Sequence, residues 1–257
     1  MSLDIDIDIQ SKKFQKVLEI FKDVNKKFIV IDGVIGAGKT TLIKLIQEDN
    51  HNNNHNNHNN HNNHNNHNNH NRPLKIKAIF EPVDLWNKTG ALQYFYKDID
   101  KNCYEFQTYT FITRIGKVID EIYENPDADI YILERSIWTD RYIFMELLKE
   151  TVGEMRMIMY KQWCDMWAYI MPMRVDKWVL LDTSLEESLR RIEIRKRDGE
   201  DGISIEYQTN LYNKHIEFYN KLKSEDKPVI IIDSNLMDSN FIEDKSHLDT
   251  IIKEILE

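Results

Sequence analysis

The chain is poor in cysteine and has fewer basic side chains than acidic ones. Its 257 residues contain two cysteines, Cys103 and Cys164, which fall in helix-type segments without the spacing of metal ligands. We therefore expect reduced, buried thiols and no disulfide framework. A formal net charge of −9 argues against a general nucleic-acid-binding protein, because phosphate backbones are bound by clustered positive surface.

Long hydrophobic runs are missing as well. No stretch reaches the roughly 18 apolar residues of a membrane-spanning helix, so we expect no membrane partner. The N-terminus, MSLDIDIDIQ, is acidic and alternating, and it lacks the positive start and apolar run of a secretory signal. These absences predict a cytoplasmic protein. The hydrophobic content of 41% still supports a substantial core, and we expect one domain over residues 1–257, with residues 1–26 as an N-terminal extension.

A tract of asparagine and histidine interrupts this composition. Seven of the nine histidines lie between His51 and Asn71, and almost all of them are three residues apart. Such a tract has no apolar area with which to offset the entropy of ordering, so we predict a disordered insertion over residues 50–72. Capture of a metal ion by the histidines is the alternative, although no carboxylate or cysteine stands among them.

Outside the tract, short apolar runs of β-type alternate with longer helix-type segments. Their near-continuous hydrophobicity is typical of strands that are buried on both faces, which predicts an α/β fold with a parallel sheet flanked by helices. Polar residues follow the runs, and in such sheets the ligand crevice lies outside the carboxyl ends of the strands. The runs are Phe28–Ile31, Ile76–Phe80, Ile130–Leu133, Trp178–Leu181 and Val229–Ile232.

The first of these runs leads into a phosphate-binding motif. Residues 33–40, GVIGAGKT, satisfy the pattern GxxxxGK[ST] between a strand and an apolar helix pattern. The glycines allow several backbone N–H groups to point at one anion, and the helix N-terminus adds partial positive charge. We expect Lys39 to reach the β- and γ-phosphates of a nucleoside triphosphate and Thr40 to place its hydroxyl on Mg²⁺. The residues assigned to this nucleotide site are Gly33, Gly36, Gly38, Lys39, Thr40 and Thr41.

The phosphate loop does not say which group receives the γ-phosphate of the bound nucleotide. Charged residues after two other runs are candidates for binding that acceptor. Glu81 follows the second run, and Pro82 stops the strand so that the carboxylate is left at the edge of the sheet. Glu134 and Arg135 follow the third run. A solvated or capping carboxylate is the alternative interpretation of Glu81.

A basic segment, RRIEIRKRDGEDG, lies further along the chain. It places three arginines within two helical turns before Gly199 and Gly202. This order describes a mobile lid that closes over transferring phosphates, and an ordinary solvated helix face is the alternative. The arginines are Arg191, Arg195 and Arg197.

An apolar stripe marks another helix-type segment. Its side chains belong either to the core or to a helix–helix interface of a dimer. They are Met155, Met159, Trp163, Met166, Trp167 and Ile170.

In this set of motifs the sequence resembles the deoxyribonucleoside kinases of the deoxycytidine/deoxyguanosine kinase type. The motifs are GVIGAGKTT, EPVDLW, YKD, FQTYTFITR, ERSIWTDRY and RIEIRKRDGEDGISIEY, and the similarity runs from about Lys27 to the C-terminus. It implies a P-loop kinase with a parallel sheet and an arginine-rich lid. It also implies a homodimer that transfers the γ-phosphate of ATP, with Mg²⁺, to the 5′-hydroxyl of a deoxynucleoside.

The resemblance further implies roles for single residues. Glu81 would be the general base on the 5′-hydroxyl, Arg135 would hold that hydroxyl and the developing charge, and Glu134 would assist at the magnesium ion. These roles agree with phosphoryl-transfer chemistry, which needs a carboxylate near the alcohol, a cation near the phosphoryl group and a metal clamp. The lid arginines of the family match Arg191, Arg195 and Arg197.

For the sugar and the base, the resemblance implies a second set of contacts. Tyr96 and Glu200 match the pair that grips the 3′-hydroxyl in the family. Arg114 and Asp140 match the two polar residues deepest in the base pocket. Thr110 departs from the family, which usually carries a smaller residue there, so the fit of the base is open at this point.

Other residues are candidates for the walls of the base pocket. Gln107 offers both an amide donor and an acceptor to a base edge. Trp86, Phe106 and Phe111 would supply stacking surfaces, with ordinary core as the alternative. An ionised Asp140 can only accept hydrogen bonds, which favours an exocyclic amino group and opposes thymine O4. We therefore expect deoxycytidine, deoxyadenosine or deoxyguanosine to be preferred over thymidine.

Two other functions share part of this pattern. A thymidylate-type nucleoside monophosphate kinase has the same fold, phosphate loop and lid, but it needs further cations for the acceptor phosphate and has less use for Glu81 as a base. A nucleotide-dependent switch hydrolyses ATP or GTP slowly whether or not a nucleoside is present.

Overall fold

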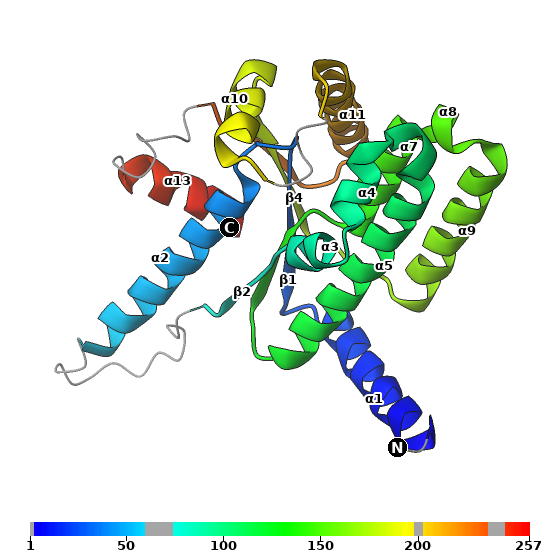
Figure 1. Cartoon of the computed structure of the whole chain (residues 1–257). Coiled ribbons are helices and arrows are strands. Elements are labelled where there is room, and N and C mark those ends of the chain that lie inside the picture. Colours follow the sequence, from blue (N-terminus) through cyan, green and yellow to red (C-terminus); the bar gives the residue numbers. More distant parts are fainter. Residues whose placement is uncertain (1–2, 60–73, 198–202, 236–244) are drawn as a thin grey trace.

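A computed structural model describes residues 3–59, 74–197, 203–235 and 245–257 of the chain (Figure 1). Strands and helices alternate along these residues, as the apolar runs predicted. The elements are α1 (Leu3–Lys22), β1 (Lys27–Asp32), α2 (Lys39–Asn59), β2 (Ile76–Ile79), α3 (Val83–Lys88), α4 (Ala91–Lys97), α5 (Ile99–Glu124), β3 (Ile130–Glu134), α6 (Ile137–Thr139), the π-helix η1 (Asp140–Phe144), α7 (Met145–Leu147), α8 (Lys149–Val152), α9 (Glu154–Ile170), β4 (Lys177–Asp182), α10 (Leu185–Arg195), α11 (Ile205–Ser224), β5 (Val229–Asp233) and α13 (Lys245–Leu256).

The strands form one parallel sheet in the order β2-β3-β1-β4-β5. The central strand β1 pairs with β3 on one side and with β4 on the other, so that Val30 lies opposite Leu133 and Trp178. Because every strand runs the same way, the segments after β1, β2 and β3 meet at one edge of the sheet. The predicted α/β class, the parallel sheet and its strand segments are confirmed.

Burial differs between the middle of the sheet and its edges. β1 and β3 are almost fully buried, as expected for strands covered on both faces. The edge strand β5 is not, and Ile231 is 41% exposed. The expectation of burial on both faces was therefore wrong for this strand, because a strand at the edge of a sheet has a neighbour on one side only.

Helices cover the two faces of the sheet. Figure 1 shows α2 and α13 on one side and α5 and α9 on the other. The end of α1 packs on the sheet through Phe21, whose ring stacks on Phe28 of β1 at a centroid distance of 4.6 Å. α1 also packs against α5. Residues before β1 thus contribute to the core, with Val17 fully buried.

Helix α2 continues beyond the phosphate loop into the asparagine and histidine tract as far as Asn59. The sequence predicted disorder from residue 50 onward, so the structure differs from that expectation over residues 50–59. A helix that has already been nucleated at Lys39 adds further turns without a new nucleation cost. Residues 60–73 lie outside the described residues, and with them most of the histidines considered for metal capture.

The two cysteines and the apolar stripe both involve α9. Cys103 in α5 and Cys164 in α9 are free and buried, as predicted. Most of the stripe on α9 is not core, since Met155, Trp163 and Ile170 are each at least 41% exposed. The core interpretation was wrong for these side chains, because α9 buries its opposite face, and it holds only for Trp167, which packs against the core. No helix in the described part of the chain is both long and apolar enough to cross a membrane.

Candidate active site

A cavity of about 800 Å³ opens where the segments after β1, β2 and β3 come together. Gly33 and Phe111 do not line this cavity, and Glu200 lies outside the described residues. All the other residues assigned from the sequence line it: Gly36, Gly38, Lys39, Thr40, Thr41, Glu81, Trp86, Tyr96, Phe106, Gln107, Thr110, Arg114, Glu134, Arg135, Asp140, Arg191, Arg195 and Arg197.

The phosphate loop takes a backbone path that a side chain would block. Gly36 has φ +81°, in the left-handed region, and a Cβ there would collide with the backbone oxygen of Ser188 in α10. The loop is thus packed directly against α10, the helix that carries Arg191 and Arg195. Gln208 of α11 fixes it from behind, because its amide nitrogen donates to the Ile35 carbonyl at 2.6 Å.

Lys39 is folded back onto this loop. Its Nζ donates to the carbonyl oxygens of Gly33 at 3.1 Å and Val34 at 2.9 Å, and the side chain is buried. Burial lowers the pKa of Lys39 to about 7, and the charge of Arg135 acts in the same direction. An anionic phosphate in the loop would raise this pKa again, so the site is built to gain from a bound phosphate.

Thr40 at the start of α2 and Glu134 at the end of β3 place two side-chain oxygen groups next to each other. The Thr40 hydroxyl donates to Oε1 of Glu134 at 2.6 Å. Mg²⁺ prefers oxygen ligands, and it is usually held by one or two protein groups together with waters and substrate phosphates. A hydroxyl and a carboxylate beside a phosphate loop therefore fit a magnesium ion.

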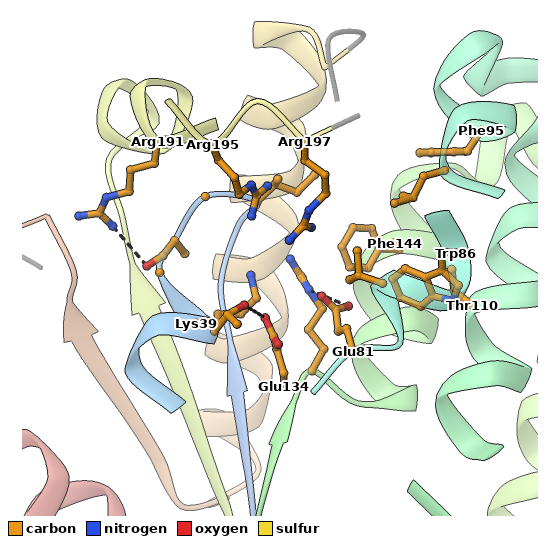
Figure 2. Close-up of a pocket in the computed structure, with 18 of the residues that line it drawn as sticks. Lys39, Glu81, Trp86, Phe95, Thr110, Glu134, Phe144, Arg191, Arg195 and Arg197 are labelled. Atoms are coloured by element: carbon orange, nitrogen blue, oxygen red, sulfur yellow. Dashed lines mark hydrogen bonds and ion pairs between the residues drawn. The ribbon is translucent and has the colours of Figure 1, made fainter. Parts of the chain in front are cut away.

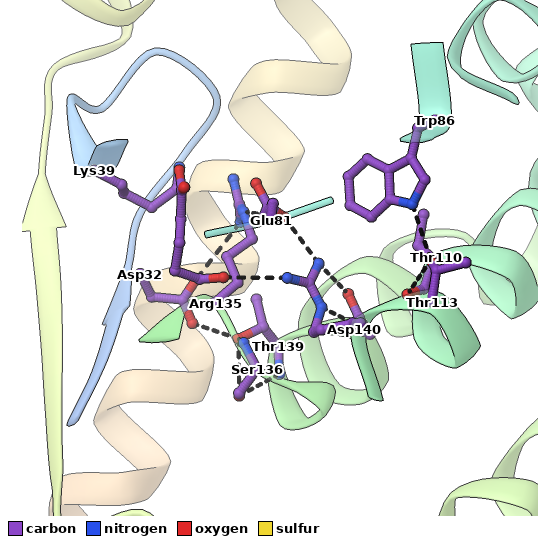
Figure 3. Close-up of polar contacts among 12 residues, drawn as sticks. Asp32, Lys39, Glu81, Trp86, Thr110, Thr113, Arg135, Ser136, Thr139 and Asp140 are labelled. Atoms are coloured by element: carbon purple, nitrogen blue, oxygen red, sulfur yellow. Dashed lines mark hydrogen bonds and ion pairs between the residues drawn. The ribbon is translucent and has the colours of Figure 1, made fainter. Parts of the chain in front are cut away.

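Glu81 lies between two arginines. Its Oε1 accepts a hydrogen bond from Nη2 of Arg114 at 2.8 Å and lies 3.4 Å from Nε of Arg135 (Figure 3). Burial alone would raise the pKa of Glu81, but these two cations and Lys39 outweigh it and lower the pKa. Glu81 is therefore a carboxylate at neutral pH.

Arg114 and Asp140 form a buried two-point ion pair. Nε of Arg114 donates to Oδ2 at 2.8 Å and Nη2 to Oδ1 at 3.1 Å, and both side chains are buried. Asp140 begins the π-helix η1, a local widening that is frequent at functional sites. Arg114 also donates to the carbonyl of Glu134, at 3.1 Å. The Arg114–Asp140 pair predicted from the sequence is thus present. Its hydrogen bond to Glu81 was not predicted.

An aromatic wall stands beside this pair, where the guanidinium of Arg114 lies over the ring of Trp86 at 5.7 Å from the centroid. Figure 2 shows Trp86 and Phe95 on this side of the cavity. Phe106 stacks on Phe95 at 4.4 Å and meets the edge of Trp86 at 6.1 Å. The indole N–H of Trp86 donates to Thr113, which fixes the ring. Phe111 is not part of the wall, because it packs against Tyr160 in the core, and its assignment to the base pocket was wrong.

Two polar residues of α5 complete this side of the cavity. Gln107 is 3% exposed. The hydroxyl of Thr110 donates to the carbonyl of Gln107 at 3.0 Å, within the same helix. Since the proton of that hydroxyl is used by the backbone, Thr110 adds bulk to the cavity and offers a base no hydrogen-bond donor.

The three arginines that were predicted to form a lid come from α10 and the residues just after it. Arg191 donates to the carbonyls of Ser234 at 2.8 Å and Ala37 at 3.4 Å. Figure 2 shows Arg195 and Arg197 directed toward the space above Lys39 and Glu81. Gly199 and Gly202, the glycines of the predicted lid loop, lie outside the described residues.

Sequence reasoning missed several residues at or behind the cavity. Phe95 and Phe144 line it, but a single aromatic residue in an amphipathic helix carries no signal that separates a cavity wall from core. Asp32 and His215 lie behind Arg135, within 3.6 Å of its guanidinium. Asp32 had a detectable signal, because it is a carboxylate at the end of the first strand, directly before the phosphate loop. His215 had none.

Comparisons with known proteins agree with this geometry. A family model described as deoxynucleoside kinase matches residues 29–257. A probable deoxycytidine kinase of fowlpox virus is 26% identical over 231 residues, which cover 89% of this chain and 86% of the viral protein. Deoxycytidine kinase of Rattus norvegicus is 27% identical over 247 residues, covering 90% and 91%. Deoxyadenosine kinase of Dictyostelium discoideum is 30% identical over 201 residues, covering 77% and 68%.

Proposed function

The chain belongs to the deoxynucleoside kinase family, and from this premise we propose that it transfers the γ-phosphate of ATP to the 5′-hydroxyl of deoxynucleosides that carry cytosine, adenine or guanine. One observation carries the proposal: Glu81 and Arg135 lie 3.4 Å apart in a single cavity whose wall includes both the phosphate loop and an aromatic pocket. This is the point at which an alcohol in the pocket would meet a phosphoryl group in the loop.

On the donor side, the loop and the N-terminus of α2 bind the phosphates of ATP. The Nζ of Lys39 exchanges its two loop carbonyls for phosphate oxygens. Thr40 and Glu134 would hold Mg²⁺, which would neutralise charge on the phosphate oxygens. Arg195 and Arg197 approach the same phosphates from the lid.

At the acceptor, Glu81 receives the proton of the 5′-hydroxyl. The hydroxyl oxygen forms a bond to the γ-phosphorus as the bond from that phosphorus to the β–γ bridging oxygen breaks, which releases ADP. Arg135 donates to the oxygens that gain negative charge. The lowered pKa of Glu81 keeps it deprotonated and ready to accept at neutral pH.

The sugar and base occupy the aromatic side of the cavity. Tyr96 contacts the 3′-hydroxyl, and the partner role of Glu200 stays a prediction. The base lies against Trp86 and Phe106, with the amide of Gln107 at its edge.

The preference among bases follows from the deepest pair. Each carboxylate oxygen of Asp140 has a lone pair beyond the one that Arg114 uses, so Asp140 can still accept from an exocyclic amino group. Four of the five N–H groups of Arg114 already donate, so no more than one is left for a base. Thymine offers O4 and a methyl group here, and neither suits a carboxylate. The names of the relatives, which refer to deoxycytidine and deoxyadenosine, point the same way.

We further propose a homodimer and keep the cytoplasmic location as a prediction. The exposed stripe of α9, formed by Met155, Met159, Trp163, Met166 and Ile170, is a wide apolar face that a second copy of the chain would cover.

A coupled assay of ADP release with each of the four deoxynucleosides, with thymidylate and without an acceptor tests the proposed function. We expect turnover with deoxycytidine, deoxyadenosine or deoxyguanosine, slower turnover with thymidine and almost none without an acceptor. Turnover that requires thymidylate would identify a monophosphate kinase instead. Equal rates with and without an acceptor would identify a nucleotide hydrolase.

A further inference from the structure

A buried polar cluster lies behind Arg135, on the side away from the cavity. Its members are Asp32 at the end of β1, Thr139 in α6 and His215 in α11, each at most 1% exposed. Figure 3 shows Asp32 and Thr139 in contact below Arg135. None of the three lines the cavity, whereas Arg135 does. The cluster therefore meets the cavity through Arg135, and Asp32 also accepts from the N–H of Gly33 in the phosphate loop at 3.3 Å.

Asp32 supplies the negative charge of this cluster. Its Oδ2 accepts from the Thr139 hydroxyl at 2.6 Å, and its Oδ1 lies 3.5 Å from Nη1 of Arg135. Burial would raise the pKa of Asp32, but His215 in the protonated form that it takes at acidic pH, Arg135 and Thr139 together lower it to about 2. A buried carboxylate that stays ionised beside a single guanidinium fixes the position of that guanidinium.

His215 supplies a hydrogen-bond acceptor to the same guanidinium. Its Nδ1 lies 2.8 Å from the carbonyl oxygen of Leu211, which can only accept, so Nδ1 carries the proton. In the neutral ring Nε2 is then an acceptor, and it lies 3.4 Å from Nη1 of Arg135. Burial and the charge of Arg135 favour this neutral form and outweigh Asp32, whose Oδ1 lies 3.6 Å from Nε2 and acts in the opposite direction.

The backbone of Arg135 shows why such support is needed. Arg135 has φ +63°, a left-handed conformation that costs free energy in a residue other than glycine and persists only where the surroundings enforce it. Its N–H donates to Ile31 at 3.0 Å, and its guanidinium lies over the ring of Phe144, 4.7 Å from the centroid. Asp32 and His215 close the remaining side, so the guanidinium is held from the back while its Nε faces Glu81.

We propose that His215 and Asp32 are positioning residues that aim Arg135 at the phosphoryl group during transfer. The inference rests on the proposed function, since it assigns these residues to the transition state of that reaction. An arginine that acts in the transition state affects kcat when it is misplaced, whereas the binding of ATP and deoxynucleoside depends on other residues. A merely structural role for the cluster would change stability and leave kcat unchanged.

Two substitutions of His215 and one matched control test the proposal. His215→Phe keeps a planar ring and removes the acceptor, and His215→Gln restores an acceptor oxygen near the position of Nε2. Tyr219→Phe is the control, because Tyr219 lies one turn further along α11, is equally buried and donates one hydrogen bond, to the Val179 carbonyl at 3.1 Å. Steady-state kcat and both KM values are measured well below the melting temperature of each variant.

We expect His215→Phe to lower kcat by about 10- to 100-fold, with KM values within about threefold of wild type. His215→Gln should recover a large part of that loss, and Tyr219→Phe should retain the wild-type kcat. Wild-type kcat in His215→Phe, or an equal loss in all three variants, would overturn the proposal.

Asp32→Asn gives an independent comparison if His215→Phe does not fold. It keeps an oxygen for Thr139 and removes the charge that faces Arg135. We expect a lower kcat with little change in KM, and wild-type kcat would contradict the positioning role. Absence of deoxynucleoside-dependent turnover in the wild-type chain is a different result, because it contradicts the proposed function itself.

Discussion

Arg114 donates from Nη2 to Oε1 of Glu81 at 2.8 Å, and so joins the base pocket to the carboxylate proposed as the general base. The same guanidinium holds Asp140 through two hydrogen bonds. One arginine therefore links the residue proposed to select the base to the residue proposed to accept the proton. A base that fits poorly against Arg114 and Asp140 is expected to disturb Glu81 as well, which would lower kcat together with affinity.

The first prediction concerns Glu81→Gln. The amide keeps the size of the side chain but cannot take up the proton, so we expect kcat to fall by about 10² or more while ATP binding is kept. Steady-state kinetics and ATP titration of the same preparation measure the two effects. Glu121→Gln is a suitable control, because that carboxylate pairs with Lys77 and Lys117 and does not line the cavity. Near-normal turnover in Glu81→Gln would show that Glu81 is not the base.

The second prediction concerns the selection of the base. Replacing both members of the buried pair, as in Arg114→Met with Asp140→Ala, avoids leaving one charge unpaired and opens volume for the thymine methyl. We expect the ratio of kcat/KM for thymidine to that for deoxycytidine to rise by about 10- to 10³-fold. Because Glu81 loses its contact with Arg114, kcat should also fall for every substrate.

A single substitution is the control for this effect. Arg114→Met alone leaves Asp140 buried without its partner, so we expect it to be less stable than the double variant by several kcal/mol. Thermal melting of the two variants gives the comparison. An unchanged thymidine ratio in a well-folded double variant would contradict the assignment of this pair to the base pocket.

The third prediction is a dependence of stability on pH. Burial lowers the pKa of His215 below its ordinary value of 6.5, although Asp32 acts against this. The unfolded chain therefore binds a proton at this histidine before the folded chain does, and the free energy of unfolding decreases as pH falls below 6.5. Above that pH, burial of His215 in its neutral form costs no stability. Below it, the free energy of unfolding decreases with a slope that approaches about 1.4 kcal/mol per pH unit.

Denaturant unfolding at several pH values between about 7.5 and 5.5 measures this dependence, because an unperturbed histidine titrates within that range. His215→Gln carries no titrating ring, so its stability should fall less steeply with decreasing pH than that of the wild type. Tyr219→Phe should keep the wild-type slope. Identical slopes for His215→Gln and the wild type would show that His215 is not buried in its neutral form.

The fourth prediction is dimerisation through the exposed stripe of α9. Light scattering at micromolar concentration should give twice the chain mass of 30.8 kDa. Trp163→Glu places a charge on the stripe and should produce a monomer, because a buried charge without a partner is costly. Val24→Glu, at a position that is 86% exposed outside α9, should remain a dimer. A monomeric wild type would refute the interface.

Sequence reasoning reached the sheet and most of the cavity for a physical reason. Buried parallel strands and the GxxxxGK[ST] loop have local patterns, and polar residues that follow parallel strands meet at one edge of the sheet. Glu81, Glu134 and Arg135 were found in this way. His215 was not, because a histidine within a helix has no local feature that reveals its contact with a strand end 80 residues away.

Two features could not be predicted from the sequence: the exposure of the apolar stripe on α9 and the length of α2. Hydrophobic periodicity marks an apolar face but does not say what covers it, and Trp163 proved to be exposed. Composition predicted disorder from residue 50 onward, yet helix α2 continues to Asn59. The cover of the stripe depends on a partner absent from the single chain, and the extent of α2 depends on propagation from the turns already formed at Lys39, which composition does not register.

The central claim is transfer of phosphate from ATP to the 5′-hydroxyl of a deoxynucleoside, and the position of the phosphate in the product tests it most directly. ³¹P NMR and mass spectrometry of a reaction with ATP, Mg²⁺ and deoxyadenosine should show a 5′-monophosphate formed in equal amount to ADP. The analogue 2′,5′-dideoxyadenosine, which lacks the accepting hydroxyl, should give no phosphorylated product. Phosphate on the 3′-oxygen, or ADP released at the same rate with the analogue, would contradict the account.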